Sequence, residues 1–366
     1  MAISLAGYAV WSLTGALALA TLLPLSKLPF GAIRGLAFPR AQMAILAALA
    51  AVFAVIMGGP LRGPAVMLAI IAFVQLGYII KFTPIWPKQS QRATPSQLAD
   101  KTRQMSLLCA NVKMSNRSYA RLMRLINDQD PDVAVAIEVD AEWTQALEEA
   151  FRYTYEHWVK VPQDNGYGLC LMSRLPLHDT KVRTLITENV PSIRTGLTLP
   201  SGDPVELHIL HPEPPVIDHD TKGRDSEIAL VGLEAQQAAV PTIVAGDLND
   251  VAWSTTTRRF QRLSGLLDPR VGRGLYNTFH ADFAVFRWPL DHLFHSAQFR
   301  LVSIKRLDHI GSDHFPIFFQ LALTAQPADA TPIEPATVQE EVEVRSMIRD
   351  EKQRDRAPIG EDWEKD

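Results

Sequence analysis

The sequence predicts an α/β domain preceded by an all-α membrane segment, and three observations support this fold class. Residues 1–80 are apolar and carry almost no charge, although 21% of the whole chain is charged. Residues 106–137 then show a strand, helix, strand pattern. Further along, residues 242–245 form a β-branched apolar run that suits a buried strand. A chain of 366 residues with these contrasting regions is expected to contain two parts of different kinds.

The membrane segment is predicted from three uncharged apolar runs, which are Ser4–Leu25, Ala41–Gly58 and Gly63–Ile80. Each is close to the roughly 20 residues that cross a bilayer as a helix. The alternatives are buried core helices or, for the first run, a signal peptide. A signal peptide would begin with basic residues, and Met1–Val10 contains no Lys or Arg. We therefore expect three transmembrane helices within residues 1–82.

The orientation in the membrane is predicted from the distribution of Lys and Arg between these runs. Lys27, Arg34 and Arg40 lie between the first two runs, and only Arg62 lies between the second and third. The basic residues that follow the third run are Lys81, Lys88, Arg92, Lys101 and Arg103. Because basic loops stay in the cytoplasm, the amino terminus is expected outside and the long C-terminal part inside.

The rest of the chain divides into a linker, a domain and a tail. Residues 83–104 contain Pro, Gln and Ser with scattered charge, which is typical of a juxtamembrane linker. Residues 105–324 have the composition of a folded domain. Residues 325–366 are expected to be a charged, disordered or solvated tail, in which Glu340–Arg356 could form an exposed charged helix. The net charge of −4 argues against nucleic-acid binding through bulk positive charge. The two cysteines, Cys109 and Cys170, lie in apolar runs and are expected to be buried free thiols.

The domain is expected to begin with a strand, helix, strand unit. A strand at Ser106–Ala110 ends at Asn111, and a second strand at Val133–Ile137 ends at Glu138. The later predicted elements are helices at Ala141–Phe151 and Ser226–Ala239 and strands at Gly168–Ser173, Val182–Ile186, Val205–His211 and Phe315–Leu323. The HPEPP sequence after the third of these strands cannot continue a central strand, so His211 is expected at an edge or rim.

The stretch PTIVAGDLND contains the strongest local signal. Thr242–Ala245 suits a strand buried on both faces, and Gly246 is expected to end it where the backbone turns. Asp247 and Asn249 follow, two residues apart, so their side chains are expected to point the same way. The alternative is an Asp/Asn turn in which both side chains bond their own backbone.

Polar residues recur at the predicted strand ends throughout the domain. They are Asn111, Glu138, His211, Asp247 with Asn249, Asp291, and Asp313 with His314. Carboxylate and amide oxygens are ligands for a hard cation such as Mg²⁺ or Mn²⁺, and the spacing of a structural zinc site is absent. Histidines add acid, base or charge-stabilising groups near neutral pH. Each residue alone could be a turn residue, and only their shared position predicts a site.

Six motifs carry a resemblance to a known family. They are NVKMSN, AIEVD, HPEPP, GDLND, PLDHLF and GSDHFP, and they occur in order between Met105 and Leu323. In this respect the chain resembles the endonuclease/exonuclease/phosphatase superfamily, with similarity to its membrane-bound bacterial members. The resemblance implies a four-layer α/β/β/α sandwich, two mixed sheets face to face with helices outside. It also implies a location in the bacterial inner membrane, and it leaves open a catalytic site that faces outward, against the orientation expected from the charge distribution.

The resemblance implies a role for each motif residue in a hydrolase that acts on phosphate esters with Mg²⁺ or Mn²⁺. The implied metal site comprises Glu138 as principal ligand, Asn111 close to the ion, and Asp313. The implied catalytic set comprises Asp247, which activates water, Asn249 and His211, which contact phosphate, and His314, which stabilises charge and is oriented by Asp291. Lys113 stands where some members of the superfamily carry an acidic residue, which puts a second metal position in doubt.

Three functions fit these expectations. A membrane-anchored phosphoesterase acting on a lipid phosphate is favoured, because membrane helices would hold the site near the bilayer. A membrane-tethered endonuclease or exonuclease is the alternative, and it would need a basic cleft. Candidate residues for such a cleft are Arg258, Arg259, Arg262, Arg270 and Arg273. The third possibility is a non-catalytic membrane scaffold.

Overall fold

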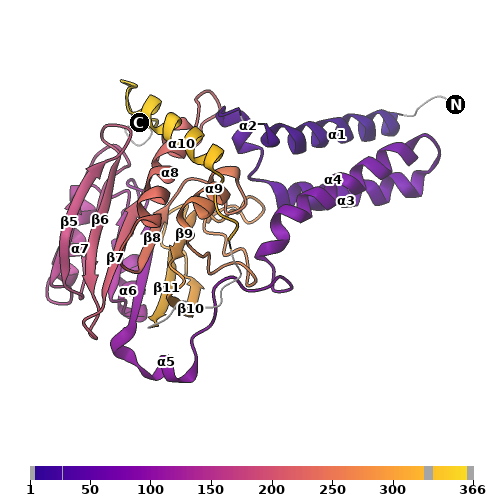
Figure 1. The fold of residues 1–366 in the computed structure, drawn as a ribbon. Coiled ribbons are helices and arrows are strands. Elements are labelled where there is room, and N and C mark those ends of the chain that lie inside the picture. The colour runs from indigo at the N-terminus through magenta and orange to yellow at the C-terminus, as the bar shows by residue number, and fades with distance from the viewer. Residues whose placement is uncertain (1–4, 27, 325–332, 361–366) are drawn as a thin grey trace.

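The computed structural model describes residues 5–26, 28–324 and 333–360, and it consists of long helices that project from an α/β domain (Figure 1). The long helices are α1 (Leu5–Leu22), α3 (Arg40–Met57) and α4 (Arg62–Ile79). Each is long and apolar enough to cross a membrane. Large apolar side chains such as Leu19, Phe53 and Phe73 are exposed on them, which suits a lipid environment.

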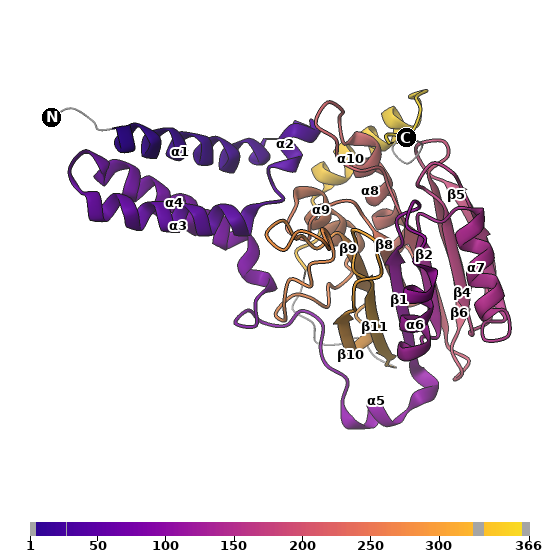
Figure 2. The ribbon, with the colours of Figure 1, turned by 180° about the vertical axis from the view of Figure 1, so that it is seen from behind.

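A polar network joins the three long helices near their domain ends. Arg40 Nη1 donates a hydrogen bond of 2.7 Å to Gln75 Oε1, and Gln75 Nε2 donates one of 2.9 Å to Thr21 Oγ1. The short helix α2 (Gly31–Gly35) connects α1 to α3 on the side of the domain. The turn between α3 and α4 lies at the opposite end, away from the domain, as both views show (Figure 1 and Figure 2).

The domain contains two mixed sheets. The six-stranded sheet has the order β10, β11, β1, β2, β4, β3, and the five-stranded sheet has the order β5, β6, β7, β8, β9. The bounds in the first sheet are β1 Gln104–Asn111, β2 Val133–Ile137, β3 His157–Val161, β4 Leu169–Ser173, β10 Phe299–Arg306 and β11 Ile317–Leu323. The bounds in the second sheet are β5 Leu177–Thr184, β6 Pro191–Thr198, β7 Pro204–Leu210, β8 Thr242–Asp247 and β9 Asp291–His295.

The sheets face each other across the main hydrophobic core, and helices cover both outer faces. The core includes Val135 and Leu171 from the first sheet and Ile209 and Ile243 from the second. Helices α6 (Tyr119–Gln129) and α7 (Ala141–Phe151) pack on the first sheet. Helices α8 (Lys222–Gln236) and α9 (Thr255–Ser264) pack on the second sheet. The four-layer sandwich expected from the sequence is therefore confirmed.

Several predicted boundaries hold, and four strands were not predicted. The strand at Val133–Ile137 and the helix at Ala141–Phe151 have the expected ends. The unpredicted strands are β3, β6, β9 and β10, in which polar residues and, in β6, Pro191 and Gly196 mask the strand signal. The strand expected at Val182–Ile186 is observed as β5, which begins at Leu177. Its beginning was not predicted, because β5 is a mostly exposed edge strand and lacks an apolar run.

Gly246 lies within a strand and does not terminate it, which corrects the sequence expectation. Strand β8 continues to Asp247, and Gly246 has a φ of 141°. A Cβ at this position would lie 1.9 Å from the carbonyl oxygen of Leu210 on the neighbouring strand. Glycine is therefore required here by the close approach of two backbones.

The described parts of the linker and of the tail both pack on the domain. In the linker, which includes α5 (Pro95–Ala99), Ser90 Oγ lies 2.8 Å from His295 Nε2. Helix α10 (Val338–Glu351) buries Val344 and Ile348 against α8 and α9. The expectation of a disordered or solvated tail is therefore wrong for residues 333–360, because an apolar stripe hidden among charged residues packs against the domain. Residues 325–332 and 361–366 lie outside the described residues.

Candidate active site

The predicted polar residues converge because several strands end at one edge of the sandwich. Strands β1 and β2 are parallel and end at Asn111 and Ile137, which are paired in register. In the other sheet, β7 and β8 are also parallel. Strand β9 runs antiparallel to β8, which places Asp291 opposite Asp247. Side chains from both sheets therefore meet at this edge, as expected from their strand-end positions.

Asn111, Glu138 and His211 form one half of the candidate site. Asn111 Nδ2 donates hydrogen bonds to Glu138 Oε1 at 2.6 Å and to Asp247 Oδ2 at 3.0 Å. His211 Nε2 lies 3.7 Å from the same oxygen of Glu138. Glu138 follows β2 with a φ of 62°, an unusual conformation for a residue with a side chain. His211 lies just beyond the end of the central strand β7, at the rim of the sheet, as predicted.

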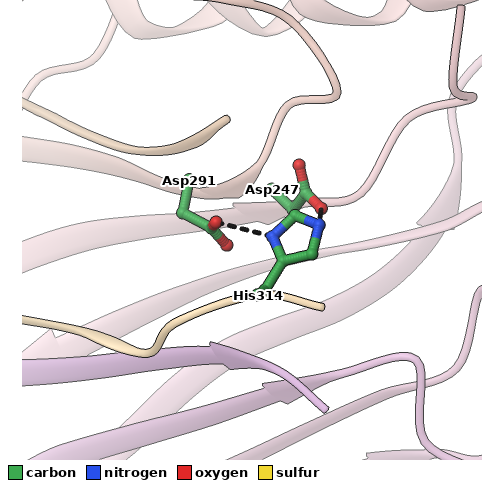
Figure 3. A group of neighbouring side chains, drawn as sticks. All are labelled: Asp247, Asp291 and His314. Carbon is green, nitrogen blue, oxygen red and sulfur yellow. Dashed lines mark hydrogen bonds and ion pairs between the residues drawn. The ribbon is translucent and has the colours of Figure 1, made fainter. Parts of the chain in front are cut away.

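Asp291, His314 and Asp247 form the other half, a buried chain of charged groups (Figure 3). His314 Nδ1 is 2.8 Å from Asp291 Oδ2, and His314 Nε2 is 3.5 Å from Asp247 Oδ2. The imidazole thus lies between two carboxylates. This arrangement fixes its orientation and favours its charged form.

Asn249 and Arg224 support the loop that follows β8. Asn249 has a φ of 51°, and its Nδ2 donates a hydrogen bond of 2.9 Å to the carbonyl of Pro212 in the HPEPP segment. Its backbone N–H bonds Asp247 Oδ1 at 2.9 Å, which is the Asp/Asn turn that the sequence left open. Arg224, which sequence reasoning missed, is buried and donates a bond of 2.8 Å to the Asn249 carbonyl. No motif marks Arg224, because helix α8 carries many polar residues.

Burial and neighbouring charges separate the protonation states of the site residues. Burial raises the pKa of Glu138 to about 8, against the hydrogen bond from Asn111. Burial also lowers the pKa of His211 to about 4, so this imidazole is neutral at physiological pH. Burial alone would lower the pKa of His314, but Asp291 and Asp247 raise it to about 10. The site therefore holds one neutral and one protonated histidine.

The donor set fits a hard divalent cation. Glu138, Asp247, Asp291 and Asp313 bring several carboxylates together, and Asp291 Oδ1 is a buried oxygen without a hydrogen-bond partner in the described structure. Asp247, Asp291 and His314 also have ligand-type atoms within 4.8 Å of one another. A protonated His314 cannot be a ligand, however, so the chemistry favours a cation at the Glu138 side.

Asp313 is only partly buried and is paired with Lys113. Lys113 Nζ lies 3.4 Å from Asp313 Oδ2, and the Asp313 side chain is 23% exposed. The ammonium group therefore brings a positive charge to the part of the site where the sequence comparison left a second metal in doubt. One cation is easier to accommodate than two beside this ion pair.

A pocket of about 370 Å³ is lined by five of the eight site residues and by Phe38 from the connection between α2 and α3. Glu138, His211, Asn249, Asp313 and His314 line its polar end. The remaining walls include aromatic and proline side chains that sequence reasoning did not assign, namely Phe38, Tyr167, Pro214, Pro215, Phe279 and Trp288. No sequence pattern distinguishes these pocket residues, because aromatic and proline side chains are also common in protein cores.

The fold and the site define a class of hydrolases that act on phosphate esters. Residues 108–314, more than half of the chain, match the Endonuclease/Exonuclease/phosphatase family, and the chain belongs to this family. The match to a structure of D. rerio TDP2 humanized by 14 mutations has 16% sequence identity and a TM-score of 0.50, and it covers 60% of this chain and 99% of the TDP2 chain. An endonuclease/exonuclease/phosphatase from Bacteroides vulgatus gives the same four values.

The match to the human Nocturnin catalytic domain with bound sulfate has 16% sequence identity and a TM-score of 0.49, and it covers 61% of this chain and 95% of the Nocturnin chain. No curated protein matches the sequence. At these identities the likeness to solved structures shows the fold alone.

Proposed function

We propose that this chain is a membrane-anchored, divalent-metal-dependent phosphoesterase that hydrolyses the phosphate ester of a lipid. The observation that carries the proposal is the composition of the pocket. Phe38, from the connection between α2 and α3, lines the same pocket as Glu138 and His314. The site that binds phosphate is thus adjacent to the apolar helices, and apolar side chains lie between the two.

The residues can be assigned to in-line attack of water on phosphorus, in which the water oxygen bonds to phosphorus, the opposite ester P–O bond breaks, and the released alkoxide takes up a proton from solvent. Asp247 orients the attacking water and accepts its proton, because its carboxylate lies between the two halves of the site and contacts both Asn111 and His314. The His314 imidazolium, held by Asp291, stabilises negative charge that develops on the phosphoryl oxygens. Neutral His211 donates a hydrogen bond to a phosphate oxygen, and Asn249 holds the HPEPP loop that carries His211.

The metal would be held by Glu138, with Asn111 close to it and Asp313 as a further ligand. When bound, a divalent ion such as Mg²⁺ or Mn²⁺ polarises the phosphoryl group and offsets its charge. A cation beside Glu138 also counteracts the burial that raises the pKa of this carboxyl, so metal binding and deprotonation are coupled. The Lys113 pair with Asp313 supports a single ion.

Membrane anchoring is supported by the direction of the helices. The basic residues Lys81, Arg34 and Arg40 lie at helix ends on the side of the domain, and the turn at residues 58–61 lies at the far end (Figure 1). The positive-inside rule then predicts a multi-pass protein of the bacterial inner membrane with a cytoplasmic catalytic domain. A reporter fused to the C-terminus and active on only one side of the membrane would test this topology.

The arginine cluster gives little support to the nuclease alternative. Arg259 and Arg262 pair with Glu340 of α10, at 3.4 and 2.5 Å. Arg270 is fully buried and pairs with Asp268 at 2.8 Å. The other two members have structural contacts as well, Arg258 with the Tyr78 ring and Arg273 with the Ser90 carbonyl. These cations therefore hold the tail, linker and helices, and they do not form a phosphate-binding cleft.

The proposal is tested with the full-length protein and a panel of phosphate esters. The panel contains phosphatidic acid, sphingomyelin, phosphoinositides, isoprenyl pyrophosphate, plasmid DNA and abasic duplex, with bis-p-nitrophenyl phosphate as a soluble reference. We expect hydrolysis of a lipid with Mg²⁺ or Mn²⁺ and none with EDTA. Glu138→Gln and Asp247→Asn should each abolish it, whereas the exposed Glu142→Gln should not. Cleavage of DNA alone would favour the nuclease, and inactivity on every ester would favour the scaffold.

A further inference from the structure

Two loops of the domain expose large apolar side chains beside the projecting helices. In the loop at residues 282–286, the exposed fractions are 58% for Phe283, 68% for Val285 and 54% for Phe286. In the loop at residues 214–219, Ile217 is 81% exposed. We call these four side chains the apolar rim. Exposed apolar residues that gather in this way mark a surface that contacts a partner.

Both loops are tied to the segments that connect the long helices. Gln42, in the first turn of α3, donates a hydrogen bond of 2.6 Å to the carbonyl of Val285. The backbone N–H groups of Gly31 and Ala32 in α2 bond the carbonyls of His219 and Ile217, at 2.8 and 3.3 Å. The apolar rim therefore lies at the level where the helices leave the domain.

The close contact between α2 and the second loop is built into the sequence. A Cβ on Gly31 would lie 1.7 Å from the carbonyl oxygen of Val216, so only glycine allows this approach. Phe30 forms an isolated β-bridge with Asp220 and adds another link between the same segments. These backbone bonds hold the position of Ile217 relative to the helices.

The same two loops form the walls of the active-site pocket. Pro214 and Pro215 begin the loop that exposes Ile217, and Phe279 and Trp288 flank the loop that exposes Val285. Phe38 lines the pocket as well, and it belongs to the connection between α2 and α3. Apolar residues that neighbour the rim in the chain therefore line the same pocket as His314, whose ring centroid is 5.0 Å from that of Phe279.

The ends of the helices also have the composition of a membrane interface. Ile85 and Trp86 follow α4 and are 80% and 38% exposed. Arg287 follows the apolar residues of the first loop and lies over the Phe315 ring. Aromatic and aliphatic residues beside Arg are typical of segments at the level of lipid headgroups.

We propose that the apolar rim of Phe283, Val285, Phe286 and Ile217 inserts into the bilayer surface and admits the phosphate headgroup of a lipid to the pocket from the membrane plane. The occupant is the bilayer because the loops of the rim are bonded to α2 and to the first turn of α3, where the apolar helices leave the domain. The substrate is then an amphiphile whose acyl chains remain in the membrane while its phosphate reaches Glu138 and His314. This inference rests on the proposed function for the substrate, but the membrane contact stands on the geometry of the rim.

The membrane contact is tested by labelling without any measurement of activity. Cys109 and Cys170 are fully buried, so a fluorophore attached to Val285→Cys in the full-length protein labels that position selectively. The matched control is Val182→Cys, which is 49% exposed on β5, far from the helices in both views (Figure 1 and Figure 2). In vesicles of phosphatidylcholine and phosphatidylglycerol with a nitroxide-labelled lipid, we expect strong quenching at residue 285 and none at residue 182. Equal quenching at both positions, or at neither, overturns the proposal.

The access role is tested by kinetics of Phe283→Ser/Phe286→Ser. The two side chains are exposed, so this variant should fold, and it should hydrolyse bis-p-nitrophenyl phosphate at the wild-type rate. With the vesicle lipid that wild type hydrolyses fastest among phosphatidic acid, sphingomyelin and phosphoinositides, kcat/KM should fall about tenfold, mainly through KM. Equal kinetics on vesicles overturns the access role. If wild type hydrolyses no lipid, the proposed function and the access role both fail, while the quenching result still decides whether the rim enters the membrane.

Discussion

The pair formed by Asp291 and His314 gives a quantitative prediction. The rise in the pKa of His314 from 6.5 to about 10 corresponds to about 5 kcal/mol in favour of the imidazolium, because one pKa unit equals about 1.4 kcal/mol. Burial opposes this rise, and Asp291 and Asp247 cause it. Asp291 is the closer carboxylate, at 2.8 Å against 3.5 Å. We therefore assign it about half of the effect, roughly 2–3 kcal/mol.

Asp291→Asn should accordingly slow hydrolysis most at alkaline pH, by up to about a hundredfold where His314 without Asp291 has become neutral but is still charged in the wild type. The sign of the pH effect follows from the raised pKa. His314 is charged below about pH 10, and loss of Asp291 makes it neutral at lower pH, so the alkaline limb of the rate profile should move down by about two pH units. The assay is the rate on bis-p-nitrophenyl phosphate across pH, with full-length protein in detergent and Mg²⁺.

The matched control is Asp203→Asn, which removes a carboxylate from a surface pair with Arg103. It should leave both the rate and the pH profile unchanged. A rate for Asp291→Asn within about threefold of wild type, with an alkaline limb at the wild-type pH, would refute the assignment of His314 as a charged stabiliser oriented by Asp291.

Three further predictions concern stability and the tail. Burial, followed by the charge of Glu213, raises the pKa of Glu227 from 4.5 to about 8, so this carboxyl costs stability increasingly as the pH rises between these values. Glu227→Gln should therefore raise the melting temperature at alkaline pH and change it little near pH 4.5. A rise in melting temperature of the same size at every pH would contradict this. Gly246→Ala should abolish folding, because its Cβ would lie 1.9 Å from the Leu210 carbonyl, and native-like near-UV circular dichroism would argue against that contact. Arg356→Ala removes the bond of 2.5 Å to Glu213 and should increase proteolysis after α10 at least severalfold; protection equal to wild type would show that this ion pair does not hold the tail.

The sequence was sufficient for the local structure and the chemistry of the site. Long uncharged runs specify helices wherever they occur, so the three long helices were found close to their observed bounds. Buried strands such as Val133–Ile137 also carry their own signal, because β-branched residues continue without a polar break. The motif residues could be named in advance, because each follows a strand and the carboxyl ends of parallel strands meet at one edge.

Contacts between distant segments could not be predicted in this way. The exposed edge strand β5 and the polar strand β10 depend on pairing with a neighbour and carry little signal of their own. The described part of the tail packs through Val344 and Ile348 and through an ion pair of Arg262 with Glu340. Local composition favours a solvated tail there, and only the complementary surface of α8 and α9 reverses that preference.

The sequence by itself determined which groups are available for chemistry, namely carboxylates, amides and histidines at strand ends, and which segment is apolar enough for a membrane. The tertiary structure decided the charge state of these groups and the surroundings of the pocket. His211 and His314 are the same residue type, yet burial leaves one neutral while two carboxylates keep the other charged. Such differences, like the position of Phe38 in the pocket, arise from atoms that are close in space and far apart along the chain.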